Sequence, residues 1–205
     1  QTVARETQLR NEKLRAELNF LKSQINPHFF FNTLNNIYAY AETGNARTAA
    51  MIERLSSILR FMVYDCGQGQ VALTKEVTAV EVLLEILRMK NEDQRSITLE
   101  VIGVKRFHLI APLIIVNFVE NACKHGNVTN NPAGFLNVTI SVADGRCRLA
   151  ITNTYTPSVV RKTANGGLGL DNIKQRLQLQ YGDAYELTEN KPDDGIYSLQ
   201  LAIPV

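Results

Sequence analysis

Residues 24–32 read Gln24-Ile25-Asn26-Pro27-His28-Phe29-Phe30-Phe31-Asn32, and here a histidine directly follows a proline inside an otherwise helical pattern. Proline has no backbone N–H and clashes with the preceding turn, so it belongs at a helix start or at a kink. Asn26 is a good N-cap and Pro27 a good first helical residue. We therefore expect a helix to restart or to kink here, with His28 in a specialised stretch of backbone.

The apolar stripe of this helix changes face at the proline. Before it, apolar residues follow the 4-3-4 spacing of a coiled-coil seam, at Leu14, Leu18, Leu21 and Ile25. After it, the same spacing recurs in another register, at Phe30, Leu34, Ile37 and Ala41. His28 is left on a polar stripe, where another molecule or domain can reach it, together with Asn32, Asn35 and Asn36. The alternative is a histidine that caps or packs locally beside the kink.

The composition is that of an ordinary soluble protein with room for two small domains. The 205 residues are 45% hydrophobic and 20% charged, with a net charge of +2. This charge gives no electrostatic reason to expect direct binding to nucleic acid or to a membrane surface. The three cysteines form no CxxC pair and indicate neither a zinc site nor a disulfide framework. Because the sequence begins at Gln1 without Met, we expect a fragment of a longer chain.

Residues 1–66 are expected to form a helical hairpin. One helix runs through His28 to about Glu42, a turn covers residues 43–45, and a second helix spans about 46–64. Such a hairpin has more apolar surface than it can cover alone, and pairing two of them into a four-helix bundle would bury it. We therefore predict a homodimer.

Residues 67–205 are expected to form a second domain that mixes helices and strands. Thr74 is expected to cap the first helix, and the predicted helices cover residues 74–91, 108–124 and 168–181. The predicted strands cover about 97–101, 135–143, 146–153, 184–189 and 195–203. This order of elements indicates an α+β fold, in which helices cover one face of a largely antiparallel sheet.

A polar stripe runs along the otherwise apolar helix predicted over residues 108–124. Its members have the helical spacing i, i+3, i+4, i+7, at Asn117, Glu120, Asn121 and Lys124. Buried amide and carboxylate groups need partners, since each unsatisfied group costs about 1–3 kcal/mol. Mg²⁺ and phosphate oxygens are such partners. The alternative is a polar helix edge that only meets solvent.

A glycine cluster precedes the last predicted helix, in Asn165-Gly166-Gly167-Leu168-Gly169-Leu170. Glycines let the backbone approach a phosphate, and the N–H groups of a helix start can receive it. The polar segment 155–164 just upstream is a candidate lid over a ligand. Asn153, at the end of a predicted core strand, is expected in the same region. By itself, such a cluster is often only a flexible turn.

Three motifs together resemble the LytS-type sensor histidine kinases, which are members of the GHKL ATPase superfamily. They are Asn-Pro-His-Phe-Phe-Phe-Asn, Val-Glu-Asn-Ala-Cys-Lys-His-Gly, and Gly-Gly-Leu-Gly-Leu-Asp-Asn-Ile-Lys-Gln-Arg-Leu. They occur in the family's order, within a match over roughly residues 20–203. The resemblance implies a dimerisation and phosphotransfer bundle from residues 1–66. It implies a GHKL (Bergerat-type) α/β sandwich that binds ATP and Mg²⁺ from residues 67–205.

The resemblance also implies roles for individual residues. His28 is then the phosphoacceptor, and Glu120 and Lys124 are the other catalytic candidates. Asn117 and Asn121 are the candidate Mg²⁺ ligands, and with Lys124 they handle the phosphates. The remaining nucleotide-binding candidates are Asn153, Gly167, Gly169 and His125, and the alternative for His125, as for His108, is a structural or substrate-edge residue.

The family usually sits on a membrane sensor and phosphorylates an aspartate of a response regulator, often one with a LytTR DNA-binding domain. The resemblance therefore implies a homodimer with a response regulator as partner and with no direct contact to nucleic acid. It also implies a membrane sensor region upstream of this fragment. We expect a cytoplasmic location, on a parent protein in the bacterial inner membrane.

One departure from the family pattern concerns the contact to adenine. Many histidine kinases have Asp-x-Gly-x-Gly where this chain has Asn153-Thr154-Tyr155-Thr156-Pro157. Asn153 can still accept a hydrogen bond through its carbonyl oxygen, but this neutral group is a weaker acceptor than a carboxylate. Two alternatives stay open: a degenerate protein that binds nucleotide weakly and acts as an interaction platform, and a GHKL ATPase in which Glu120 activates water.

Overall fold

The structure is a computed structural model, and it describes residues 27–65, 69–90, 96–126, 131, 133–155, 168–190 and 195–205. The chain divides into two compact units, residues 1–48 and residues 49–205. The leucine seam of residues 14–25 and most of the predicted lid, residues 156–164, lie outside the described residues. The functional boundary expected between residues 66 and 67 stays a prediction.

The first unit contains α2 (Pro27–Glu42), whose described part begins at the proline. A turn follows, in which Gly44 has a φ of +63° and donates its N–H to the Ala41 carbonyl oxygen at 3.0 Å. The side-chain oxygen of Asn45 then accepts the Arg47 N–H at 2.9 Å and caps the next helix. The predicted end of the first helix and the turn after it are confirmed.

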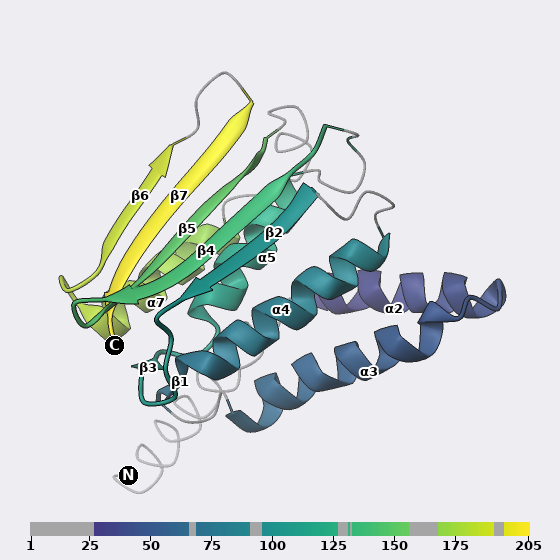
Figure 1. The fold of residues 1–205 in the computed structure, drawn as a ribbon, viewed down its shortest axis with the longest axis horizontal. Helices are drawn as coiled ribbons and strands as arrows, with labels where there is room; N and C mark the ends of the chain where they lie inside the picture. Colours follow the sequence, from purple (N-terminus) through teal and green to yellow (C-terminus); the bar gives the residue numbers. More distant parts are fainter. Residues whose placement is uncertain are drawn as a thin grey trace, which may run out of the picture. The chain divides into compact units, whose positions relative to one another are not determined.

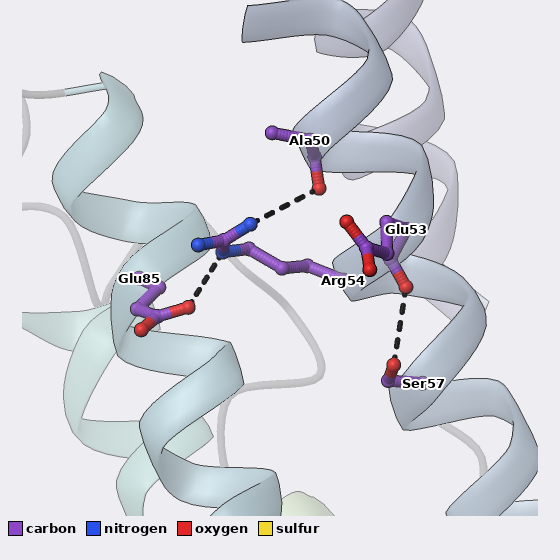
Figure 2. Close-up of polar contacts among 5 residues, drawn as sticks. All are labelled: Ala50, Glu53, Arg54, Ser57 and Glu85. Carbon is purple, nitrogen blue, oxygen red and sulfur yellow. Dashed lines mark hydrogen bonds and ion pairs between the residues drawn. The ribbon is translucent and has the colours of Figure 1, made fainter.

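The helix α3 (Arg47–Arg60) lies mostly in the second unit and continues into a short π-helix, η1 (Phe61–Asp65). An ion pair joins α3 to α4 (Leu73–Lys90), with Arg54 Nε 2.5 Å from Glu85 Oε2 (Figure 2). Both side chains are partly exposed, so solvent screens the pair and its contribution to stability is small. The burial of three apolar side chains stabilises α3 more than this ion pair does, at Met51, Leu55 and Ile58.

The start of α4 differs from the expectation. Thr74 is not the N-cap, because the helix already begins at Leu73 and Thr74 lies inside its first turn. A two-residue strand, β1 (Val71–Ala72), runs directly into the helix. The Leu73 N–H donates to the His108 carbonyl oxygen at 2.8 Å, so a distant part of the chain satisfies this N–H of the first turn.

The second unit is built on a five-stranded mixed sheet with the order β2-β4-β5-β7-β6 (Figure 1). The strand bounds are Ile97–Ile102 for β2, Leu136–Ala143 for β4, Arg146–Thr154 for β5, Glu186–Asn190 for β6 and Ile196–Pro204 for β7. The pair β2–β4 is parallel and the other three pairs are antiparallel. The predicted α+β class and largely antiparallel sheet are therefore confirmed.

Helices cover one face of this sheet. In Figure 1, α5 (Ile114–His125) and α7 (Leu168–Tyr181) lie across the sheet, and α4 packs beside α5. Alternate residues of the central strands are buried on this face, at Leu136, Val138, Ile140, Cys147, Leu149, Ile151, Leu199, Leu201 and Ile203. None of the described helices is both long and apolar enough to cross a membrane.

The helix predicted over residues 108–124 begins six residues later than expected, at Ile114. Its expected first turn is instead a short strand, β3 (Leu109–Ile110), which pairs antiparallel with β1. The residues from Ile110 to Val116 are all buried, and an apolar run of this kind does not show by its periodicity whether it forms strand or helix. Pro112 and the left-handed Leu113 (φ 60°) separate the two elements.

Candidate functional site

The polar stripe predicted on α5 lies at the edge of a buried helix. Asn117, Glu120 and Asn121 are half-buried and Lys124 is exposed, while most of the apolar residues between them are buried. The stripe is thus neither a fully solvated edge nor part of the core. Half-buried amide and carboxylate oxygens on one face are donors of the type that Mg²⁺ takes, so these residues fit the implied ion.

The start of α5 is held by Glu76, a carboxylate on α4 that the sequence reasoning did not single out. Glu76 accepts the backbone N–H of Leu113, of Ile115 at 3.1 Å and of Val116 at 3.2 Å. Leu113 occupies the N-cap position and gives no side-chain cap of its own. A residue about 40 positions upstream therefore supplies the cap, which no local motif indicates.

Burial dominates the electrostatics of Glu76. It raises the pKa of this carboxyl from 4.5 to about 7, against the three N–H bonds and the Arg176 charge, which lower it. Cys147 and Tyr181 also face it, and burial is the main cause that raises the pKa of each, to about 12 for the Cys147 thiol. The Tyr181 hydroxyl accepts the Ala111 N–H at 2.8 Å, just before α5.

The end of α5 is joined to the end of strand β5. The Thr154 hydroxyl donates to the carbonyl oxygen of Gly126, the residue that follows α5, at 2.7 Å. Thr154 also exchanges hydrogen bonds with Phe135 at 3.1 and 3.3 Å, which ties the start of β4 to the same point. The asparagine stripe and Asn153 thus belong to elements that meet here, a neighbourhood that the sequence patterns did not indicate.

Asn153 is fully buried at this junction. Its side-chain N–H₂ donates to the Thr154 carbonyl oxygen at 2.7 Å, whereas its Oδ1 has no hydrogen-bond partner among the described residues. A buried acceptor without a donor costs about 1–3 kcal/mol, so this oxygen is suited to a ligand that brings an N–H group. The exocyclic amino group of adenine is such a donor, and Asn153 therefore fits the implied nucleotide.

Other predicted site residues are placed only by their backbone or not at all. His28 lies in the first turn of α2, and Asn35 and Ala39, on the same helical face, are exposed. His125 is the last residue of α5 and Gly169 lies in the first turn of α7. The side chains of His28 and His125 lie outside what the structure describes, and so does the whole of Gly167.

The described residues contain no group of three or more histidine, cysteine or acidic side chains that is placed to hold a metal ion. The Mg²⁺ ligands predicted from the sequence, Asn117 and Asn121, both lie on the α5 stripe. An Mg²⁺ ion held by these two amides would need further oxygen ligands, which phosphate groups and water usually supply.

Comparisons with known proteins give a consistent set of relatives. A family model described as "Histidine kinase" matches residues 16–95. Sensor histidine kinase YpdA of Escherichia coli is 29% identical over 198 residues, which cover 93% of this chain and 35% of that protein. Sensor protein LytS of Oceanobacillus iheyensis is 25% identical over 193 residues, which cover 88% of this chain and 33% of that protein.

Solved structures give a weaker likeness. The catalytic domain of histidine kinase ThkA aligns with a TM-score of 0.45 and 16% identity, over 66% of this chain and 93% of that domain. The chain spans about a third of the length of the curated relatives it matches.

Proposed function

We propose that this chain, a relative of the LytS-type sensor histidine kinases, is an ATP-dependent protein histidine kinase of a two-component system. It phosphorylates itself on His28 and passes the phosphoryl group to an aspartate of a response regulator. The observation that best supports this proposal is the junction of α5 with β5. There the buried Asn153 Oδ1, which has no hydrogen-bond partner among the described residues, lies at the end of β5 that Thr154 joins to the end of α5.

The nucleotide site is assigned to residues of the second unit. The Asn153 Oδ1 accepts the adenine amino group, and the Asn117 and Asn121 oxygens hold Mg²⁺. Lys124 adds a positive charge beside the phosphates. When bound, Mg²⁺ neutralises charge on the transferring phosphoryl group, which is the main catalytic requirement of this reaction. The edge of the site is assigned to His125, Gly167 and Gly169.

The phosphoacceptor is assigned to the first turn of α2. A neutral His28 nitrogen attacks the γ-phosphorus, a P–N bond forms, and the bond to the oxygen that leaves with ADP breaks. The partial positive charge at the start of a helix favours the neutral imidazole before the reaction and the phosphorylated ring after it. The exposure of Asn35 and Ala39 supports a face that another domain can reach.

A homodimer is part of the proposal. The helix α2 exposes a stripe of large apolar residues, with exposed fractions of 65% for Phe31, 50% for Leu34 and 66% for Tyr38. A second copy of the same helix would cover such a stripe in a four-helix bundle. We further propose a response regulator of the LytTR type as partner, and a parent protein with a membrane sensor region.

The test is an incubation of the full chain with γ-labelled ATP and Mg²⁺, followed by mapping of acid-labile phosphate. We expect label on His28, its loss in His28→Gln, and unchanged nucleotide binding in that variant. Label that persists in His28→Gln refutes the assignment. Absence of binding at millimolar ATP favours an interaction platform. Phosphate release that survives His28→Gln but not Glu120→Gln favours an ATPase.

A further inference from the structure

We propose that Glu76 is a positioning residue of the nucleotide site. It lies in the first turn of α4 and holds the first residues of α5, the helix whose half-buried edge carries the asparagine stripe. The inference rests on the proposed function, because it assigns to Glu76 the task of keeping Asn117 and Asn121 in place for Mg²⁺ and phosphate. It adds a residue that none of the three sequence motifs contains.

The link from Glu76 to the stripe is short. The Leu113 N–H donates to the Glu76 carboxylate, and the Leu113 carbonyl oxygen accepts the Asn117 N–H at 3.2 Å. The Val116 N–H, one residue before Asn117, donates to the same carboxylate at 3.2 Å. A displacement of the carboxylate therefore moves the peptide groups on which the first residue of the stripe depends.

The cap has no substitute within α5. Leu113 is in a left-handed conformation and offers no side-chain acceptor, so the first N–H groups of the helix depend on Glu76. Among the described residues Glu76 is the only buried carboxylate. Since the other end of α5 is fixed by the Gly126–Thr154 hydrogen bond, α5 is held from outside at both ends, with the stripe between them.

The charge on Glu76 makes this cap sensitive to pH. The groups that face it are the Arg176 guanidinium and the Tyr181 hydroxyl from α7 and the Cys147 thiol from β5, while α5 contributes backbone N–H groups. Burial raises the pKa of Glu76 to about 7. A protonated carboxyl uses one oxygen as a donor and accepts fewer N–H bonds, so below that pH the first turn of α5 has a weaker cap, although the folded chain as a whole gains because it no longer buries a charge.

The test compares Mg²⁺–ADP binding to the full chain and to its Glu76→Gln variant at pH 6 and pH 8, by titration calorimetry. The introduced amide imitates the protonated acid, so we expect similar dissociation constants at pH 6 and about tenfold weaker binding of the variant at pH 8. Glu81→Gln, an exposed change on the same helix, is the control and should bind like the wild type at both pH values. The proposal is overturned if wild type and Glu76→Gln have equal dissociation constants at pH 8, or if the ratio of their dissociation constants is the same at pH 6 and pH 8.

Hydrogen exchange followed by mass spectrometry gives a readout that does not require nucleotide. We expect faster exchange in Glu76→Gln over residues 113–121 and unchanged protection in β5 and β7. If Glu76→Gln does not fold, the wild type at pH 6 and pH 8, corrected for intrinsic rates, should show the same local difference. Protection of residues 113–121 that does not depend on Glu76 or on pH overturns the inference. Failure of the wild type to bind nucleotide, together with the local change in exchange, would instead refute the proposed function alone.

Discussion

Replacement of Glu76 by glutamine should change how the stability of the folded chain depends on pH. The folded-state pKa of about 7 lies above the ordinary value of 4.5, because the carboxyl is buried. Between these two values the folded protein holds one proton more than the unfolded chain. The contribution of Glu76 to stability is therefore fully present at low pH and is lost as the pH rises through 7.

The magnitude follows from the size of this shift. One pKa unit corresponds to about 1.4 kcal/mol, so Glu76 should lower the free energy of unfolding by roughly 2–3 kcal/mol between pH 5 and pH 8. Glutamine does not titrate, and the variant should lack this decrease. Because all other groups remain, the difference between the two proteins isolates the contribution of Glu76.

The assay is urea denaturation of wild type, Glu76→Gln and Glu81→Gln at pH 5, 6, 7 and 8, with both midpoint and slope determined. We expect the stability difference between wild type and Glu76→Gln to change by roughly 2–3 kcal/mol over this range. The Glu81→Gln curve should run parallel to the wild type, because this side chain is exposed. If the Glu76→Gln curve is also parallel to the wild type, the reasoning about burial at the start of α5 is refuted.

Three further changes test the rest of the site and the unit that carries it. Asn153→Asp should strengthen Mg²⁺–ADP binding, since a carboxylate is a stronger acceptor, and Asn153→Leu should weaken it about fivefold or more. Equal affinities of the two variants, measured by calorimetry, would contradict the role of Oδ1. Thr154→Val should lower the free energy of unfolding by about 1 kcal/mol through loss of the hydrogen bond to Gly126, whereas Thr154→Ser should retain this hydrogen bond. Equal stabilities of the two variants in urea denaturation would count against this bond. In a double-mutant cycle of Arg54→Met and Glu85→Gln, the coupling free energy between the two side chains (Figure 2) should be below about 1 kcal/mol and should decline at high salt. A larger coupling free energy that does not depend on salt would instead indicate a buried pair.

The sequence alone determined the elements whose signals are local. The hairpin of β4 and β5 could be predicted to within one residue at each end, because strict alternation surrounds Asp144-Gly145, and both turn residues have positive φ (52° and 69°). The helix α7 likewise ends where its apolar period ends. The spacing of Asn117 and Asn121 was also sufficient to place them on one face of a helix.

How these pieces combine into a site depends on contacts between distant parts of the chain. The start of α5 depends on β3 pairing with β1 and on Glu76, whose partners lie 37 to 40 residues further along the chain. The neighbourhood of Asn153 and the α5 stripe depends on the Thr154 hydrogen bond to Gly126, 28 positions away. Such contacts leave no periodic or compositional signal, because the two partners become neighbours only after the chain has packed. The residue types of the site can thus be read from the sequence, whereas the cap that holds them is a property of the fold.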